Sequence, residues 1–167
     1  ILVFYFAYLG QAWNLLMGFA GQLSLGHALY LGLGAYTATA LWTLFGIGPW
    51  IGVFIAIPVA AAAGMIVGWL GWRFAIEGVY FALLTIAFAE FTRIGFDHLQ
   101  ITGASAGLFL SVNSPGSDKW WNLGGGPLLY YYLALVLAVA ATLAVAWLRR
   151  SPLGYRWLAV REDPEAA

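Results

Sequence analysis

Residues 1–72 contain no Asp, Glu, Lys or Arg, yet a polar, glycine-containing stretch at residues 21–27, GQLSLGH, interrupts them. A typical soluble domain carries about 25% charged residues, whereas this chain has 8% charged and 63% hydrophobic residues. Such a chain cannot cover a water-facing surface with charge, so lipid is the expected solvent. The polar interruption then lies inside membrane-type sequence and needs an explanation.

Five apolar segments approach the roughly 20 residues that a membrane-spanning helix needs. They are residues 1–19, 28–45, 51–70, 79–96 and 128–148. The runs are continuous rather than alternating, and Ala and Leu dominate them, which is typical of helices. We therefore predict an all-α polytopic membrane protein with about five spans and a broken or re-entrant element at residues 21–27. Residues 1–148 form the expected transmembrane core, and residues 149–167 form a charged tail.

Several function classes are excluded or disfavoured by residue types. Seven basic and seven acidic residues cancel, so no net field favours nucleic acid. The absence of cysteine excludes disulfides, thiolate metal sites and cysteine nucleophiles. No acidic residue precedes Glu77 and no second histidine lies near His27, so no metal site is expected. The chain also lacks the G-x-S-x-G, H-E-x-x-H and P-loop motifs, and we expect neither an enzyme nor a bound cofactor.

Basic residues predict the orientation in the membrane. If the fourth and fifth spans form a hairpin, five of the seven basic residues fall on one side, and Lys119 is the only basic residue in the connection on the other side. The positive-inside rule places the five in the cytoplasm and residues 97–127 outside. The five are Arg73, Arg149, Arg150, Arg156 and Arg161.

The polar break has two interpretations of equal weight on physical grounds. Irregular backbone at membrane depth is tolerated where protein or a water-filled cavity satisfies it, and transporters use such broken helices at substrate sites. Gln22, Ser24 and His27 would then supply hydrogen bonds to a translocation pathway. The alternative is a loop at the membrane surface that joins two ordinary helices.

Glu90 and Arg93 form a second polar feature inside a predicted span. At positions i and i+3 they share one helical face, about 20 Å from the expected helix start at 1.5 Å per residue. Ionisable side chains in a membrane pair or face a cavity. A structural ion pair and a polar patch on the translocation route are both consistent with this spacing, and a proton-coupled carrier would also need such a carboxylate.

The tail begins with a helix-start signal. Ser151 is a possible N-cap and Pro152 suits the first helical position. A short amphipathic helix is expected from Tyr155 to Glu162. It would either lie on the inner leaflet or dock a cytoplasmic partner.

Four blocks resemble, in the same order, the LivM-type permeases of branched-chain amino acid ABC transporters. They are residues 14–41 (NLLMGFAGQLSLGHALYLGLGAYTATAL), 78–94 (GVYFALLTIAFAEFTRI), 102–108 (TGASAGL) and 151–167 (SPLGYRWLAVREDPEAA). The third block has Ala104 where the family usually has Gly. The family's loop and later spans continue beyond Ala167, and the chain begins with Ile rather than Met, so we expect a piece of a larger permease.

The resemblance implies a role and its partners. The chain would be part of one of two permease subunits, beside a LivH-type subunit, in the bacterial inner membrane. Two cytoplasmic ATP-binding subunits would bind the ATP and drive alternating access, and a periplasmic binding protein would deliver branched-chain amino acids or related small polar solutes. The resemblance assigns to the membrane element Gln22, Ser24, Gly26 and His27, and to the ATPase-docking region Arg161, Glu162, Asp163, Glu165, Ala166 and Ala167.

Two other hypotheses compete with the permease. One is a proton- or ion-coupled secondary carrier that uses Glu90, and the other is a membrane scaffold. Dependence of transport on ATP would support the permease, and dependence on a proton gradient would support the carrier.

Overall fold

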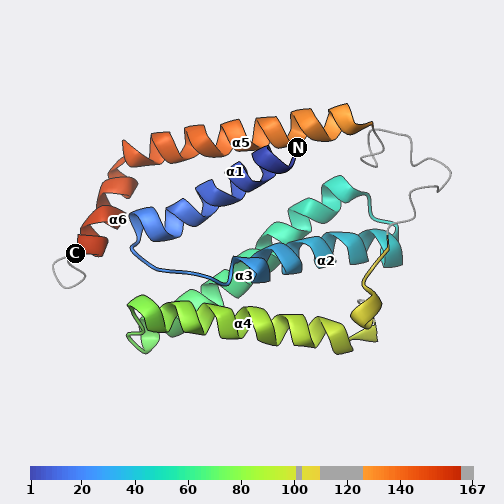
Figure 1. The fold of residues 1–167 in the computed structure, drawn as a ribbon, viewed down its shortest axis with the longest axis horizontal. Helices are drawn as coiled ribbons and strands as arrows, with labels where there is room; N and C mark the ends of the chain where they lie inside the picture. The colour runs from blue at the N-terminus through green and yellow to red at the C-terminus, as the bar shows by residue number, and fades with distance from the viewer. Residues whose placement is uncertain (101–102, 110–125, 163–167) are drawn as a thin grey trace. The chain divides into compact units, whose positions relative to one another are not determined.

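The computed structural model describes residues 1–100, 103–109 and 126–162, and these residues are helical apart from short connections. Within these described residues, five helical segments are long and apolar enough to cross a membrane. The predicted fold class, an all-α polytopic membrane protein with about five spans and a broken element, is confirmed. The chain divides into two compact units, Ile1–Ser24 with Gly126–Ala167, and Leu25–Gly125 (Figure 1).

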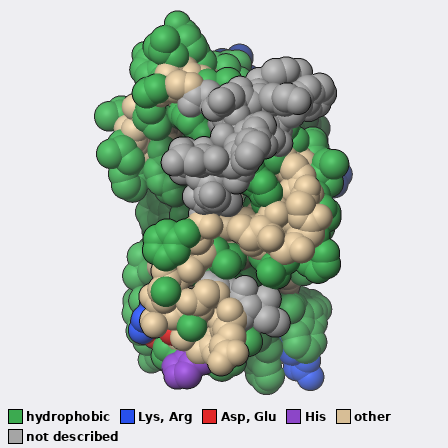
Figure 2. Space-filling model, turned by 90° about the vertical axis from the view of Figure 1, so that its right-hand side faces the viewer, with side chains coloured by type: hydrophobic (Ala, Val, Ile, Leu, Met, Phe, Trp, Pro, Cys, Tyr) green, Lys and Arg blue, Asp and Glu red, His purple; other side chains and the backbone are tan. Residues whose placement is uncertain are grey.

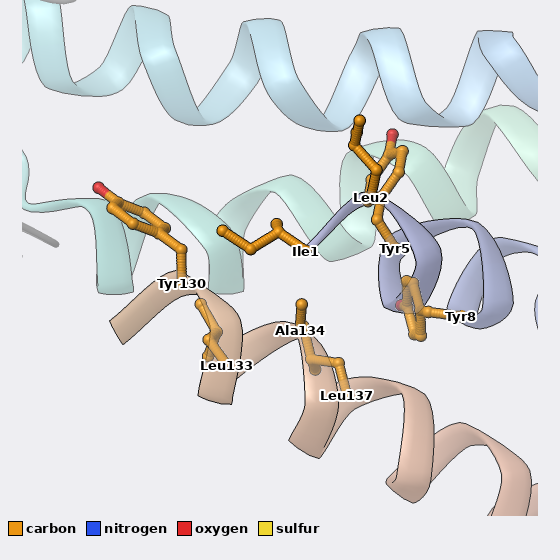
Figure 3. Close-up of a pocket in the computed structure, with 8 residues that line it drawn as sticks. All are labelled: Ile1, Leu2, Tyr5, Tyr8, Tyr130, Leu133, Ala134 and Leu137. Carbon is orange, nitrogen blue, oxygen red and sulfur yellow. The ribbon is translucent and has the colours of Figure 1, made fainter. Parts of the chain in front are cut away.

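The first unit contains α1 (Leu2–Asn14), a π-helical turn (Leu15–Phe19), α5 (Pro127–Arg149) and α6 (Pro152–Glu162). Helices α1 and α5 lie side by side (Figure 1). Near the starts of both helices, the rings of Phe4 and Tyr131 meet edge to face with centroids 5.4 Å apart. The two helices therefore begin at the same end of this unit. Figure 3 shows an apolar groove at this end, lined by Ile1, Leu2, Tyr5, Tyr8, Tyr130, Leu133, Ala134 and Leu137.

The second unit contains α2 (His27–Phe45), α3 (Pro49–Arg73) and α4 (Gly78–His98). A tight turn joins α2 to α3, and Gly46 adopts the left-handed conformation (φ 65°) that commonly ends a helix. Small residues bring these two helices together: a Cβ atom added at Gly52 would lie 3.3 Å from the carbonyl oxygen of Ala38. Close backbone approach through small residues is typical of helix packing in lipid.

Helix α3 differs from the expected third span. It begins at Pro49 rather than residue 51, because proline suits the first turn of a helix. It continues through Pro58 and ends at Arg73 rather than residue 70. Two glycines of α3 have different surroundings: Gly64 faces the Tyr30 ring, whereas nothing lies within 4 Å of a Cβ placed at Gly68.

The distribution of exposed and buried side chains is the reverse of that in a soluble domain. Large apolar side chains face outward all along the spans, for example Phe54 at 73% exposure and Phe91 at 75%. Hydrophobic side chains are far more abundant than charged ones on the face seen in Figure 2. The largest fully buried side chains among the described residues are Val67, Thr85 and Ser24, two of which carry a hydroxyl group. The interior polar groups therefore mark the segment that needs a functional explanation.

Candidate functional site

The break in the first span lies where the sequence predicts it. The π-helical turn Leu15–Phe19 ends α1, residues 21–26 have no regular structure, and α2 begins at His27. Most backbone N–H and C=O groups in such a segment lose their helical partners. In a membrane they need other partners within the protein or in water.

A side-chain donor and a backbone acceptor from the first span satisfy the first part of the break. The indole Nε1 of Trp13 donates a hydrogen bond to the carbonyl oxygen of Ser24 at 2.8 Å. The amide of Gln22 donates to the carbonyl oxygen of Leu16 at 3.2 Å. Both contacts return the chain toward the end of the first span, so the break is a folded turn.

Helix α4 satisfies the second part of the break. The amide of Leu25 donates to Thr85 Oγ1 at 3.1 Å, and that hydroxyl donates to the carbonyl oxygen of Ala82 at 2.8 Å. The neighbouring Gly26 approaches so closely that an added Cβ would overlap the Thr85 carbonyl oxygen and lie 3.0 Å from Thr85 Cβ. Only glycine fits at position 26 without a shift of the α4 backbone.

The predicted pathway side chains of the break have different surroundings. Gln22 is half-buried, and its Oε1 is a buried acceptor without a hydrogen-bond partner in the described part of the chain. Ser24 is fully buried. His27 is half-buried, and its ring meets Tyr30 edge to face with centroids 5.8 Å apart. Gln22 therefore retains hydrogen-bonding capacity that this fold does not use.

The predicted polar pair on α4 is present and includes a third residue. Arg93 Nε lies 3.0 Å from Glu90 Oε2, and Arg93 Nη1 lies 2.9 Å from Asp97 Oδ2. Glu90 and Arg93 are exposed and Asp97 is half-buried, and the three share one face of α4. Thr85 is buried on a different face, about 7.5 Å nearer the start of the helix than Glu90. The structure therefore does not bring Glu90 and Arg93 together with Leu25 and Gly26, the part of the break that contacts Thr85.

The start of the tail helix forms as its sequence predicts. Ser151 Oγ accepts a hydrogen bond from the amide of Gly154 at 3.2 Å, which is the geometry of an N-cap, and Pro152 is the first residue of α6. A Cβ at Gly154 would overlap the carbonyl oxygen of Leu148. Ser151, Pro152 and Gly154 therefore fix the direction in which α6 continues from the end of α5. The helix predicted from Tyr155 to Glu162 is present within α6, but it does not separate apolar and polar residues onto two faces, so its predicted amphipathic character is wrong.

Arg161 lies against the break. Its Nη1 donates to the carbonyl oxygen of Gly18 at 2.9 Å, and its Cγ would lie 2.9 Å from a Cβ at Gly21. Among the other predicted docking residues, the side chain of Glu162 and all of Asp163, Glu165, Ala166 and Ala167 lie outside the described residues. The described residues contain no group of three or more His, Cys, Asp or Glu that could hold a metal ion.

Three residues of these sites escaped the sequence analysis. Trp13 and Thr85 hold the break, and Asp97 extends the ion pair. Asp97 had a usable signal, since it follows Arg93 at i+4. Thr85 had a weaker one, because a hydroxyl inside an apolar span can bond within its own helix or across to a neighbour. Trp13 looked like one more apolar residue of the first span.

The family model and the related proteins that match this chain indicate the same family. A family model described as "Branched-chain amino acid transport system / permease component" matches residues 1–167. The chain is 32% identical over 176 aligned residues to the high-affinity branched-chain amino acid transport system permease protein LivM of Salmonella typhimurium, and equally to that of Escherichia coli. Each alignment covers 93% of this chain and 41% of the relative, so the chain spans about two fifths of the relatives' length. The search of solved structures found no significant match.

Proposed function

Because this chain belongs to the family of branched-chain amino acid transport permease components, we propose that it forms part of the membrane pathway of an ATP-binding cassette importer. The family consists of transport components rather than enzymes. The five apolar helices agree with a multi-pass membrane protein. We propose the bacterial inner membrane as its location, with the tail in the cytoplasm.

The observation that carries this proposal is the folded polar break. In the interrupted segment, the Ser24 carbonyl accepts a hydrogen bond from Trp13 and the Leu25 amide donates one to Thr85, while the outer surface of the spans remains apolar. Transport proteins place such discontinuous helices at their substrate sites, where freed backbone groups meet the ligand. Gln22, Ser24, Gly26 and His27 are accordingly our candidates for the gate or the lining of the pathway.

Substrate recognition follows from the chemistry of the break. An amino acid carries an ammonium group, which donates hydrogen bonds, and Gln22 Oε1 is a buried acceptor with unused capacity. We propose branched-chain amino acids or related small polar solutes as the substrates. The pathway performs no bond chemistry, so no catalytic group is required from this chain.

The energy for transport comes, in this proposal, from partner subunits. Two cytoplasmic ATP-binding subunits bind the ATP and move the segment around α6, a second LivH-type permease subunit completes the pathway, and a periplasmic protein delivers substrate. Alternating access then exposes the break first to one side and then to the other. Arg161, Glu162, Asp163, Glu165, Ala166 and Ala167 form the proposed coupling region.

A carrier driven by protons or ions through Glu90 is not favoured. The family is one of transport-system components, and Glu90 is already engaged by the guanidinium group of Arg93.

Reconstitution tests the proposed function. The full-length protein with its partner subunits is placed in proteoliposomes, and uptake of radiolabelled leucine, isoleucine and valine is measured with the cognate binding protein. Uptake should require both ATP and the binding protein. Uptake that depends on a proton gradient and does not depend on ATP would support the carrier instead.

The same assay tests the coupling region. Glu162→Gln or Asp163→Asn should uncouple ATP hydrolysis from uptake. Coupled uptake at the wild-type level in both variants would show that these two residues have no coupling role.

A further inference from the structure

Arg161 caps the end of the first span from another helix. Its Nη1 reaches the carbonyl oxygen of Gly18 at 2.9 Å across a sequence separation of 143 residues. Gly18 belongs to the last helical turn before the break, where carbonyl groups lack partners in their own helix. A cation at a helix C-terminus is stabilising because it meets both these carbonyls and the negative end of the helix dipole.

The stem of the same side chain rests on Gly21. A Cβ at Gly21 would lie 2.9 Å from Arg161 Cγ and 3.6 Å from Arg161 Cβ. Gly21 has φ +68°, a conformation that other residues rarely adopt. Arg161 therefore contacts the end of the first span through its guanidinium group and the break through its methylene groups, and a glycine at position 21 leaves space for these methylene groups.

The position of Arg161 on α6 makes this contact mechanically useful. At its start, α6 is fixed to α5 by the Ser151 cap and by the close approach of Gly154 to Leu148. Near its end it is fixed to the first span through Arg161. Apart from Gly154, its described side chains between these two anchors are exposed or half-buried. A force applied to this end of α6 thus has a direct physical path to the break, of the kind that transmits coupling between sites.

We propose that Arg161 is a positioning residue that links the coupling segment to the broken first span, so that a displacement of α6 changes the geometry of residues 18–21. This inference rests on the proposed function. It also revises the role that the family resemblance implies for Arg161, since its side chain faces the permease's own first span rather than a partner subunit.

A disulfide tests the contact. The 3.6 Å between the two Cβ positions falls within the range that disulfides span, and this chain contains no cysteine. The variant Gly21→Cys/Arg161→Cys, in full-length protein freed of any other cysteine, should cross-link under mild oxidant. The control Gly21→Cys/Arg156→Cys, which uses an exposed arginine of the same helix, should not. Cross-linking is read from gel mobility after cleavage at a protease site introduced between the two positions.

The cross-link also tests the mechanical role. The reduced variant lacks the Arg161 guanidinium group and should transport poorly, like Arg161→Met. Oxidation replaces the lost contact with a covalent link and should raise ATP-dependent uptake in proteoliposomes, and dithiothreitol should lower it again. Uptake by the oxidised, cross-linked protein at the rate of the reduced protein would overturn the proposal, as would failure to cross-link.

Single substitutions give an independent readout. Arg161→Met, which keeps the stem and removes the donors, should lower the substrate transported per ATP hydrolysed by about fivefold or more, the scale of typical coupling between sites. Arg161→Lys keeps a cation and should retain most of this ratio, and Arg156→Met should match wild type. A ratio unchanged in Arg161→Met would overturn the proposal. If the wild-type assembly shows no ATP-dependent uptake, the proposed function fails, while the cross-link still reports whether the contact exists.

Discussion

Gly26 lies against Thr85 so closely that the α4 backbone occupies the space where a side chain at position 26 would begin. One residue earlier, the Leu25 amide donates to the Thr85 hydroxyl at 3.1 Å. The end of the break therefore packs on α4 for two reasons. Gly26 has no side chain to keep the two backbones apart, and the Thr85 hydroxyl accepts a hydrogen bond from Leu25. These two features are separable, because each can be changed without the other.

Replacement of Gly26 should destabilise the second unit. In Gly26→Ala the new methyl group meets the Thr85 carbonyl oxygen, which is backbone and cannot rotate away. Forced overpacking costs roughly 1–3 kcal/mol, so the thermal unfolding temperature of purified full-length protein in detergent should fall, and uptake should fall with it.

Gly32 provides the matched control for this substitution. It lies inside α2, and nothing is within 4 Å of a Cβ placed there. Gly32→Ala should be neutral or stabilising by up to about 1 kcal/mol, because alanine is the better helix former. Equal destabilisation by both substitutions would mean that Gly26 is not in close contact with α4.

Removal of the Thr85 hydroxyl should destabilise the same joint for another reason. Thr85→Val keeps the shape but leaves the Leu25 amide without its acceptor in a buried site, at a cost of about 1–3 kcal/mol. Thr85→Ser keeps the hydroxyl and should lose less stability.

Thr43 is the corresponding control for Thr85. Within the part of the chain that the structure describes, its hydroxyl donates only to carbonyl groups of its own helix, those of Thr39 and Ala40. Thr43→Val should leave the unfolding temperature in detergent nearly unchanged. If Thr85→Val is equally silent, water or another group serves the Leu25 amide.

The spans could be predicted from sequence because lipid imposes a simple rule on length and polarity. The position of the break was equally visible, since GQLSLGH is conspicuous among apolar residues. What the break contacts could not be predicted, because Thr85 lies 60 residues away and its hydroxyl looks like an ordinary polar residue of a span. Arg161 shows the same limit: its charge indicated a cytoplasmic tail, but only three-dimensional structure reveals that it reaches Gly18.

Loss of Arg93 should be worse for folding than loss of Glu90. Arg93 is the partner of both Glu90 and Asp97, so Arg93→Gln leaves two carboxylates without their cation on one face of a span, which is costly in a membrane. Glu90→Gln leaves Arg93 paired with Asp97. We expect a several-fold drop in folded protein recovered from the membrane for Arg93→Gln and a smaller one for Glu90→Gln.

The double variant Glu90→Gln/Arg93→Gln checks this explanation. It should recover part of the yield lost in Arg93→Gln, because one unpaired carboxylate has been removed. A double variant that is no better than Arg93→Gln would indicate that Arg93 acts through a contact other than the one with Glu90, for instance with a partner subunit.

Gln22 should affect stability and transport in opposite directions. Its Oε1 is buried without a hydrogen-bond partner in the described residues, and an unsatisfied buried acceptor costs about 1–3 kcal/mol. Gln22→Met removes that acceptor at similar size, so the protein should unfold at the same or a higher temperature. If the oxygen accepts a hydrogen bond from the ammonium group of a substrate, KM for ATP-dependent uptake should rise about tenfold, the scale of one hydrogen bond to a charged group. Gln11→Met, at a glutamine inside α1, should change neither quantity. A Gln22→Met protein that is less stable but has an unchanged KM would show that the oxygen has a structural partner and does not contact the substrate.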